Sequence, residues 1–222
     1  MHEDAPPILG QPARRGSRSI VPWLVVASPL LVLPLAEYFT VGPTGTWLLV
    51  MLPGLIVLPA LVAFVFVFVG PFLLLSPRLR LKALRRWGLC LIFVASTIAG
   101  GRMAREIRND AFHRLTQRSS DLVAAIKHFE RVKGVPPPGL DALVPEFLKA
   151  VPGTGMAAYP AYRYRTGDDA RRFAQNPWVL WVSTPSGGVN FDEFMYFPLQ
   201  NYPQRGYGGS LQRIGDWAYL HE

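Results

Sequence analysis

The stretch of sequence that decides the fold is WGLCLIFVASTIAGG, residues Trp87–Gly101, together with the RMAREIRND that follows it over residues 102–110. The first part has no charged residue, and the second has five in nine positions. A helix of 15 residues covers roughly 22 Å, less than the ~30 Å of the hydrocarbon core of a bilayer. Arginine side chains beyond both ends can reach the lipid headgroups and close this difference. We therefore expect a short membrane span over 87–101, with an interfacial or buried helix as the alternative.

Two longer apolar runs precede this stretch. Ile20–Phe39 has 20 residues and Trp47–Leu75 has 29, and about 20 apolar residues are enough for a helix to cross a bilayer. The prolines within both runs can bend a membrane helix without ending it. The first run is too long for the apolar part of a signal peptide, so we interpret it as an uncleaved anchor. The sequence thus predicts a transmembrane region over 20–101, with spans at about 20–39, 47–75 and 87–101.

The composition excludes an ordinary soluble protein. Half of the residues are hydrophobic, only 17% are charged, and the mean hydropathy is +0.20, whereas soluble domains carry nearer a quarter charged residues. The net charge of +8 is gathered beside the apolar runs, and the part after residue 133 is about neutral. This placement is typical of a membrane-topology signal and not of a nucleic-acid surface. We expect the lipid bilayer as a partner and no nucleic acid.

The basic residues also predict an orientation. The tail 1–19 contains three arginines, the loop 40–46 contains no Lys or Arg, and the loop 76–86 contains five basic residues. Because cytoplasmic loops are enriched in Lys and Arg, we expect the tail and the second loop inside the cell. The tail is rich in Pro and Arg and is expected to be disordered.

A third span would export the remainder, 102–222, to the periplasmic side of a bacterial inner membrane. The three arginines at positions 102, 105 and 108 would then lie just outside the last span. If the run 87–101 does not cross, these arginines stay in the cytoplasm and the charge rule is obeyed better. Both topologies remain open at this point, and we expect the exported one.

An amphipathic helix is expected to continue from the last span into water. Apolar residues recur every four or three positions along one face, which must pack against another part of the chain. These residues are Met103, Ile107, Ala111, Leu115, Leu122, Ile126 and Phe129. Gly134 and the prolines at 136–138 end the helical pattern.

Residues 139–222 change to short segments that are rich in aromatic and β-branched residues. Leu140–Leu148 predicts a short helix or turn that Pro145 breaks. Four segments are typical of strands, namely 162–165, 178–183, 191–197 and 217–221, with turn signals at 166–169, 185–188 and 205–210. A small antiparallel sheet packed on the preceding helix gives a two-layer α+β domain.

The segment GVPPPGLDALVPEFL, residues 134–148, resembles the G-x-Y-P-x-x-L-x-x-L-V-P-x-Y-L segment of the major pseudopilins of type II secretion. LVAAIKHF at 122–129 is similar to the end of the long helix in that family, and Pro152 and the pair Tyr162 and Tyr164 also fit its pattern. The resemblance covers about residues 87–165. It implies an exported domain in which a sheet packs on the continuation of a membrane helix, as in type IV pilins and pseudopilins.

Two features depart from that family. Pilins follow the Gly of a basic leader with an aromatic residue or Met and then Thr-Leu-x-Glu, but the run from Gly88 has no Glu near its start. Two further apolar runs also precede it. For the calcium-binding acids of the family, Asp168-Asp169 and Asp192-Glu193 are the candidate matches. The description that fits is a polytopic membrane protein with a pilin-like C-terminal domain.

No pattern in the sequence predicts an enzyme, so we expect no catalytic, cofactor-binding or metal-binding residues and no cofactor. His113 and His128 are 15 residues apart, far from the spacing of a helical metal site. His221 can pair with an acid but is not predicted as a site. Glu37 is the one acid within an apolar run, which makes it a candidate for ion or proton handling. Its place near the end of the run favours the outer interface.

Two functional hypotheses follow. In the first, the chain is a non-catalytic inner-membrane protein whose exported pilin-like domain interacts with other envelope, secretion or pilus proteins. In the alternative, it is a membrane-anchored sensor or binding module that recognises a cell-envelope ligand through exposed aromatic side chains. Residues 159–219 contain 14 aromatic side chains, and strand alternation is expected to turn about half of them inward.

Overall fold

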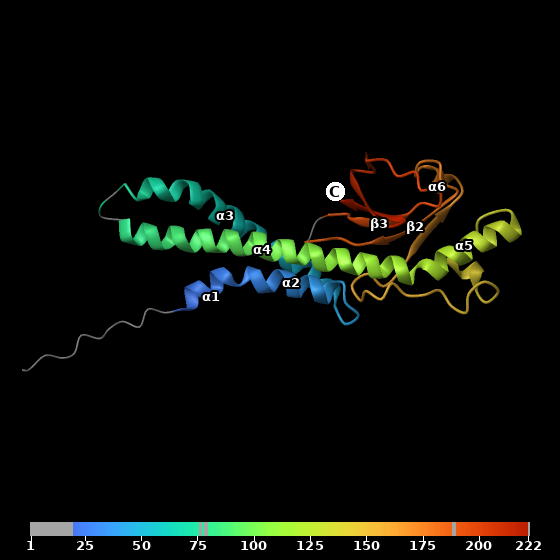
Figure 1. Cartoon of the computed structure of the whole chain (residues 1–222), viewed down its shortest axis with the longest axis horizontal. Helices are drawn as coiled ribbons and strands as arrows, with labels where there is room; N and C mark the ends of the chain where they lie inside the picture. The colour runs from blue at the N-terminus through green and yellow to red at the C-terminus, as the bar shows by residue number, and fades with distance from the viewer. Residues whose placement is uncertain (1–19, 76, 78–79, 188–189, 222) are drawn as a thin grey trace, which may run out of the picture.

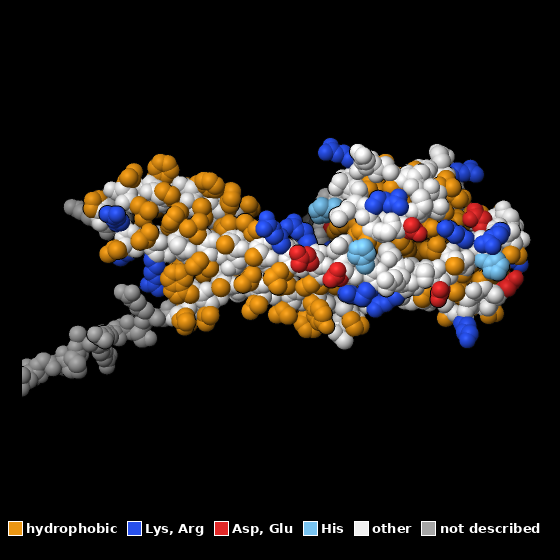
Figure 2. All heavy atoms as spheres, in the orientation of Figure 1, with side chains coloured by type: hydrophobic (Ala, Val, Ile, Leu, Met, Phe, Trp, Pro, Cys, Tyr) orange, Lys and Arg blue, Asp and Glu red, His pale blue; other side chains and the backbone are white. Residues whose placement is uncertain are grey.

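The computed structural model describes residues 20–75, 77, 80–187 and 190–221, and the predicted N-terminal tail lies outside these residues. A bundle of helices forms one end of the elongated molecule and a sheet domain forms the other, and the long helix α4 belongs to both (Figure 1). Hydrophobic side chains cover the surface of the helical end, whereas charged side chains gather on the sheet domain (Figure 2). This is the arrangement of a membrane-anchored α+β protein.

The apolar runs form the helical end. The first run gives two helices, α1 (Val21–Ala27) and α2 (Pro29–Thr40), which are bent by 44° relative to each other. A short 3-10 helix, η1 (Trp47–Met51), leads into α3 (Leu52–Leu73), and α4 extends over Arg80–Arg118. Within the described residues, two helical segments are long and apolar enough to cross a membrane, Trp47–Leu73 and α4, and the bent pair adds a third only if it forms one span.

The predicted short span at 87–101 is the middle of a much longer helix. α4 has 39 residues and begins at Arg80, seven positions before the apolar run starts. The preceding residues RLKALRR are good helix formers, so the helix extends through them towards the basic loop. The charged turns at both ends are helical too, so the 15 apolar residues are the middle of a continuous helix that is long enough to cross a bilayer.

Close contacts at two glycines bring the three helices together. A Cβ atom on Gly70 of α3 would lie 2.4 Å from the Trp87 ring of α4, and a Cβ atom on Gly100 of α4 would lie 2.3 Å from the Pro29 carbonyl oxygen of α2. The Trp87 indole also donates a hydrogen bond of 2.8 Å to the carbonyl of Val67. The helices can approach this closely because glycine has no side chain, as is common in membrane helix pairs.

The predicted amphipathic helix is divided. α4 ends at Arg118 and α5 spans Ser120–Lys133, with Ser119 between them. The Ser119 hydroxyl donates to the carbonyl of Leu115 at 2.5 Å, a local bond that competes with a straight helix. Gly134 ends α5 in the left-handed conformation with φ 77°, which confirms the predicted stop.

The apolar face of α4 differs from the predicted one at two positions. Met103 is 46% exposed, and Arg108 is buried together with Phe112 and Leu115. These three buried residues are spaced by four and three positions and so share one face of the helix. The predicted face was chosen from apolar residue types and therefore did not include Arg108.

The C-terminal domain contains a six-stranded antiparallel sheet with the order β1-β2-β3-β6-β5-β4. The strands are β1 (Arg163–Thr166), β2 (Trp178–Ser183), β3 (Glu193–Tyr196), β4 (Arg205–Gly206), β5 (Gly209–Ile214) and β6 (Trp217–His221). A short 3-10 helix, η2 (Leu140–Leu143), and the four-residue helix α6 (Asp168–Arg171) lie in the connections. The four predicted strands are present, and the turn predicted at 205–210 is the hairpin turn between β4 and β5, two strands that were not predicted.

Both faces of the sheet are covered, so the domain has more layers than predicted. On one face, Trp178, Phe194 and Trp217 pack against α4 and α5 in the larger core. On the other face, Trp181 and Phe197 pack under α6 and the loops beside it. Phe191 is the one exposed large aromatic residue in the described part of this domain. The expectation that about half of the aromatic side chains face outward is therefore wrong.

The sheet domain and the helical end share their core. Val41 and Val50, which flank the turn between α2 and α3, belong to the larger core cluster of the domain. The backbone N–H of Ala157 donates to the carbonyl of Gly42 at 2.8 Å. A Cβ atom on Gly54, in the first turn of α3, would lie 2.9 Å from the carbonyl oxygen of Gly187 in the β2–β3 loop. The domain is therefore packed directly on the C-terminal end of α2 and the N-terminal end of α3.

The contact at Gly100 predicts a stability difference between two neighbouring positions. Gly100→Ala brings a methyl group against the Pro29 backbone, which cannot turn away, so we expect unfolding of the purified protein in detergent to require about 1–3 kcal/mol less free energy. Gly101→Ala is the matched control, because a Cβ atom there meets no atom within 4 Å. The control should be unchanged or more stable by about 0.5–1 kcal/mol. Equal melting temperatures for the two variants would contradict the proposed helix contact.

Candidate functional site

A buried ion pair joins α2 to α4 beyond the apolar part of α4. Arg108 Nε donates to Glu37 Oε1 at 2.7 Å, and Arg108 Nη2 donates to Glu37 Oε2 at 3.3 Å. Arg108 is 6% exposed and Glu37 is 8% exposed. Two hydrogen bonds between the same two groups fix their relative orientation. In a buried site each of the two charges is stabilised by the other. The pair therefore fixes the register of the two helices.

The same guanidinium group also binds the sheet domain. Arg108 Nη1 donates to the carbonyl of Thr184, one residue after β2, at 2.8 Å. Arg108 Nη2 donates to the hydroxyl oxygen of Tyr159 at 3.4 Å, and Tyr159 donates in turn to the carbonyl of Pro185 at 2.6 Å. One side chain on α4 thus holds α2, the β2–β3 loop and the segment before β1.

Burial keeps the tyrosine of this site protonated. It raises the pKa of Tyr159 to about 12, and the positive charge of Arg108 opposes part of that rise. Burial likewise raises the pKa of Tyr219, on β6, above its usual range. Both hydroxyl groups therefore remain hydrogen-bond donors at neutral pH and act as structural groups, since neither is set to release a proton there.

A second polar group surrounds the buried carboxylate of Asp192, just before β3. Oδ2 accepts hydrogen bonds from Ser186 Oγ at 2.6 Å, from Asn190 Nδ2 at 3.1 Å and from the hydroxyl of Tyr219. Nδ1 of His221 lies 2.9 Å from Oδ1. These contacts tie the β2–β3 loop to the last strand of the sheet.

Thr184 connects the two polar groups. Its carbonyl accepts from Arg108, and its N–H donates to the carbonyl of Asp192 at 2.8 Å. The Tyr219 ring, whose hydroxyl reaches Asp192, also packs on Phe112 of α4 with ring centroids 5.0 Å apart. The result is a continuous polar cluster from Glu37 at the end of α2 to His221 at the end of β6. We call this set of residues the boundary cluster; it comprises Glu37, Arg108, Tyr159, Thr184, Asp192, Tyr219 and His221.

The sequence singled out Glu37, Asp192 and His221 of the boundary cluster but did not predict which residues pair with them. Glu37 lies near the end of its apolar run as expected, but sequence reasoning did not predict that Arg108 pairs with it. A signal was present, because Arg108 lies four positions before Phe112 and seven before Leu115, both of which are apolar. His221 does pair with an acid, and that acid is Asp192.

The candidate calcium-binding acids of the sequence are not brought together. Asp168 pairs with Arg171 at 3.1 Å and Asp169 lies 3.8 Å from Arg172, all in exposed positions around α6. Asp192 directs both of its oxygen atoms to protein donors. Across the described ranges, no three His, Cys, Asp or Glu side chains form a group that could hold a metal ion. The other two candidate histidines, His113 and His128, are exposed on α4 and α5.

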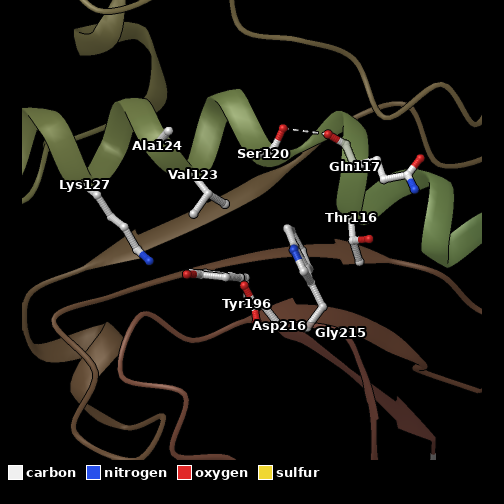
Figure 3. A pocket seen from close by; sticks show the side chains of 10 residues that line it. Thr116, Gln117, Ser120, Val123, Ala124, Lys127, Tyr196, Gly215 and Asp216 are labelled. Carbon is white, nitrogen blue, oxygen red and sulfur yellow. Dashed lines mark hydrogen bonds between the residues drawn. The ribbon is translucent and has the colours of Figure 1, made fainter.

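An open groove of about 510 Å³ lies between the helices and the sheet, and no residue of the boundary cluster lines it (Figure 3). Gln117, Ser120 and Val123 line it from the helices, and Tyr196 and Asp216 line it from the sheet. Lys127 reaches over the ring of Tyr196, with its Nζ atom 5.4 Å from the ring centroid. The groove is shallow and mixed in character, and its aromatic floor belongs to the core.

Comparison with known proteins does not assign the chain to a class, because no family model, curated protein or solved structure matches it. The fold and the boundary cluster therefore define it only as a membrane-anchored α+β protein.

The ion pair predicts a strongly non-additive mutational pattern. Glu37→Gln leaves the buried guanidinium without its counter-charge, so we expect the free energy of unfolding in detergent to fall by about 3–5 kcal/mol. The double variant Glu37→Met with Arg108→Met removes both charges and should lose much less than the single variants Glu37→Met and Arg108→Met together.

The matched control is Glu146→Gln, which breaks the exposed 3.4 Å pair of Glu146 with Lys133. Exposed pairs contribute little, so its change should stay within about 0.5 kcal/mol. If the loss of unfolding free energy in the double variant equals the sum of the losses in the two single variants, the side chains of Glu37 and Arg108 do not depend on each other.

Proposed function

We propose that this protein is a non-catalytic, membrane-anchored component that presents its sheet domain outside the cytoplasm to another protein of the cell envelope. The observation that carries the proposal is the shared core: Val41 and Val50 from the helical end pack inside the sheet domain. Arg108 adds a polar connection between the same parts. A domain held in this way keeps a fixed distance and orientation relative to the bilayer, which suits an assembly or docking role.

The charges support an exported domain with three spans. The start of α1, the end of α3 and the start of α4 lie at the end of the molecule away from the sheet domain (Figure 1). Arg80, Lys82, Arg85 and Arg86, in the first turns of α4, lie at that end, as the charge rule requires for the cytoplasmic side. On the opposite side, Glu37 neutralises Arg108. This pairing removes one of the three arginines that argued against export.

The pilin-like interpretation remains part of the proposal. One helix continues from the apolar region into the domain, and an antiparallel sheet packs on its polar half, as the resemblance of residues 134–148 implies. The helices α1 to α3 have no counterpart in a processed pilin. We therefore propose a permanently anchored relative of that architecture, with a role in secretion or pilus assembly as the working hypothesis.

Exposed apolar residues at the far end of the domain offer an interaction surface. Val132 and Val135, at and after the end of α5, are exposed, and so is Val144 in the following segment. α5 ends at the tip of the molecule opposite the apolar helices (Figure 1). The alternative hypothesis, a ligand-binding module that uses exposed aromatic residues, is less favoured because Phe191 is the one exposed aromatic side chain in the described sheet domain.

The orientation can be tested with single cysteines. In a Cys90→Ala background, Ser210→Cys places an exposed thiol on the sheet and Lys82→Cys places one at the opposite end of the molecule. A membrane-impermeant maleimide added to intact spheroplasts should label position 210, and it should label position 82 only after the membrane is permeabilised. The reverse pattern would place the domain in the cytoplasm and end the proposal.

The interaction role can be tested by photo-crosslinking in the organism that makes the protein. A photoreactive phenylalanine analogue at Val132 or Val135 should give a discrete adduct with one envelope protein. The same analogue at Leu55, which is exposed on α3 within the apolar region, is the control and should give no protein adduct of that size. Equal adducts at all three positions, or none at the tip, would contradict a specific docking role.

A further inference from the structure

One of two exposed arginines on α4, Arg102, is level with exposed leucines on the two neighbouring apolar helices, and the second, Arg105, follows one turn later. The contact of Gly100 with Pro29 and the ion pair of Arg108 with Glu37 are separated by eight residues on each helix. α2 and α4 therefore run in the same direction in a constant register, which Figure 1 also shows. In this register Arg102 is level with Leu31, which is 64% exposed on the apolar surface.

The packing of α3 against α4 places Arg102 at the same depth, independently of the contacts of α2. Gly70 of α3 contacts Trp87 of α4, and the two helices run in opposite directions. Leu55 lies fifteen residues before Gly70, and Arg102 lies fifteen residues after Trp87, so both are at one height. Leu55 is 72% exposed. Exposed leucines on α2 and α3 thus lie at the same height as Arg102 on α4.

Arg102 and Arg105 make no ion pair within the described part of the chain. Both are exposed, and no ion pair joins either of them to an acid among the described residues, including the nearby exposed Glu106. They are three positions apart, so their side chains leave adjacent parts of the helix surface. Exposed Met103 lies between them in sequence. Figure 2 shows basic side chains gathered where the hydrophobic surface ends beside the sheet domain.

We propose that Arg102 and Arg105 bind the phosphate groups of anionic phospholipids at the boundary between the bilayer and the sheet domain. A guanidinium group at tail depth has to reach the headgroups to be solvated, and its planar N–H groups match a phosphate at two points. Two such groups one turn apart favour a negatively charged headgroup over a zwitterionic one. This inference depends on the membrane anchoring and not on the proposed function of the domain.

A local fluorescence measurement tests the site. The full chain with Cys90→Ala and Met103→Cys is labelled at position 103 with a small fluorophore and placed in phosphatidylcholine vesicles. Brominated phosphatidylglycerol or brominated phosphatidylcholine is then added as the quencher. The basic residues of the first turns of α4 lie far from the fluorophore, because the nearest of them, Arg86, is 17 positions before residue 103, or about 25 Å along a helix.

We expect phosphatidylglycerol to associate more strongly than phosphatidylcholine, by roughly fivefold for each arginine that contacts an anionic surface. Arg102→Gln with Arg105→Gln should abolish this preference. Arg131→Gln with Arg163→Gln, which removes the same charge from exposed positions on the distal domain, should retain it. Raising the salt to 1 M should weaken the preference for phosphatidylglycerol of the protein that keeps both arginines, since the attraction is electrostatic. Equal quenching by the two lipids, or a preference that survives removal of both arginines, would overturn the site.

Discussion

The rest of the structure depends on one guanidinium group that is held out of water. Arg108 satisfies the carboxylate of Glu37, the carbonyl of Thr184 and the hydroxyl of Tyr159 at the same time. Burying a charge is unfavourable unless each of its donors finds a partner, so this residue tolerates only an arrangement in which α2 and the β2–β3 loop are both in place. The interaction therefore selects one way of assembling the helices with the domain, while the apolar contacts around it supply most of the stability.

The sheet leaves little of its apolar surface uncovered. Its strand β2 is buried almost throughout, because α4 and α5 cover one face and α6 with its neighbouring loops covers the other. A three-layered domain of this kind places its aromatic side chains in two cores. Few large apolar residues of the described domain remain exposed, among them Phe191 and the valines at the tip, so a partner that bound this surface would have to use shape and charge in addition to apolar contact.

Local signals in the sequence predicted the elements that depend on neighbouring residues. The stop at Gly134 and the strands β2 and β6 lie where glycine and aromatic patterns place them. Strand β5 was missed because GSLQRI is largely polar and begins in a glycine-rich segment that predicts a turn. The pairing of Arg108 with Glu37 was missed for a different reason: it joins residues 71 positions apart, and no periodicity within one helix contains that information. The candidate site therefore emerged only from the tertiary structure.

The shared core has a consequence for how the chain is made. Val41 and Val50 leave the ribosome long before Trp178 and Trp217, with which they share one hydrophobic cluster. The turn between α2 and α3 therefore has no complete core to join until the last strand has been synthesised. Folding of the sheet domain is in this way coupled to correct placement of the first helices, and a nascent chain in which they are misplaced would lack part of its folding template.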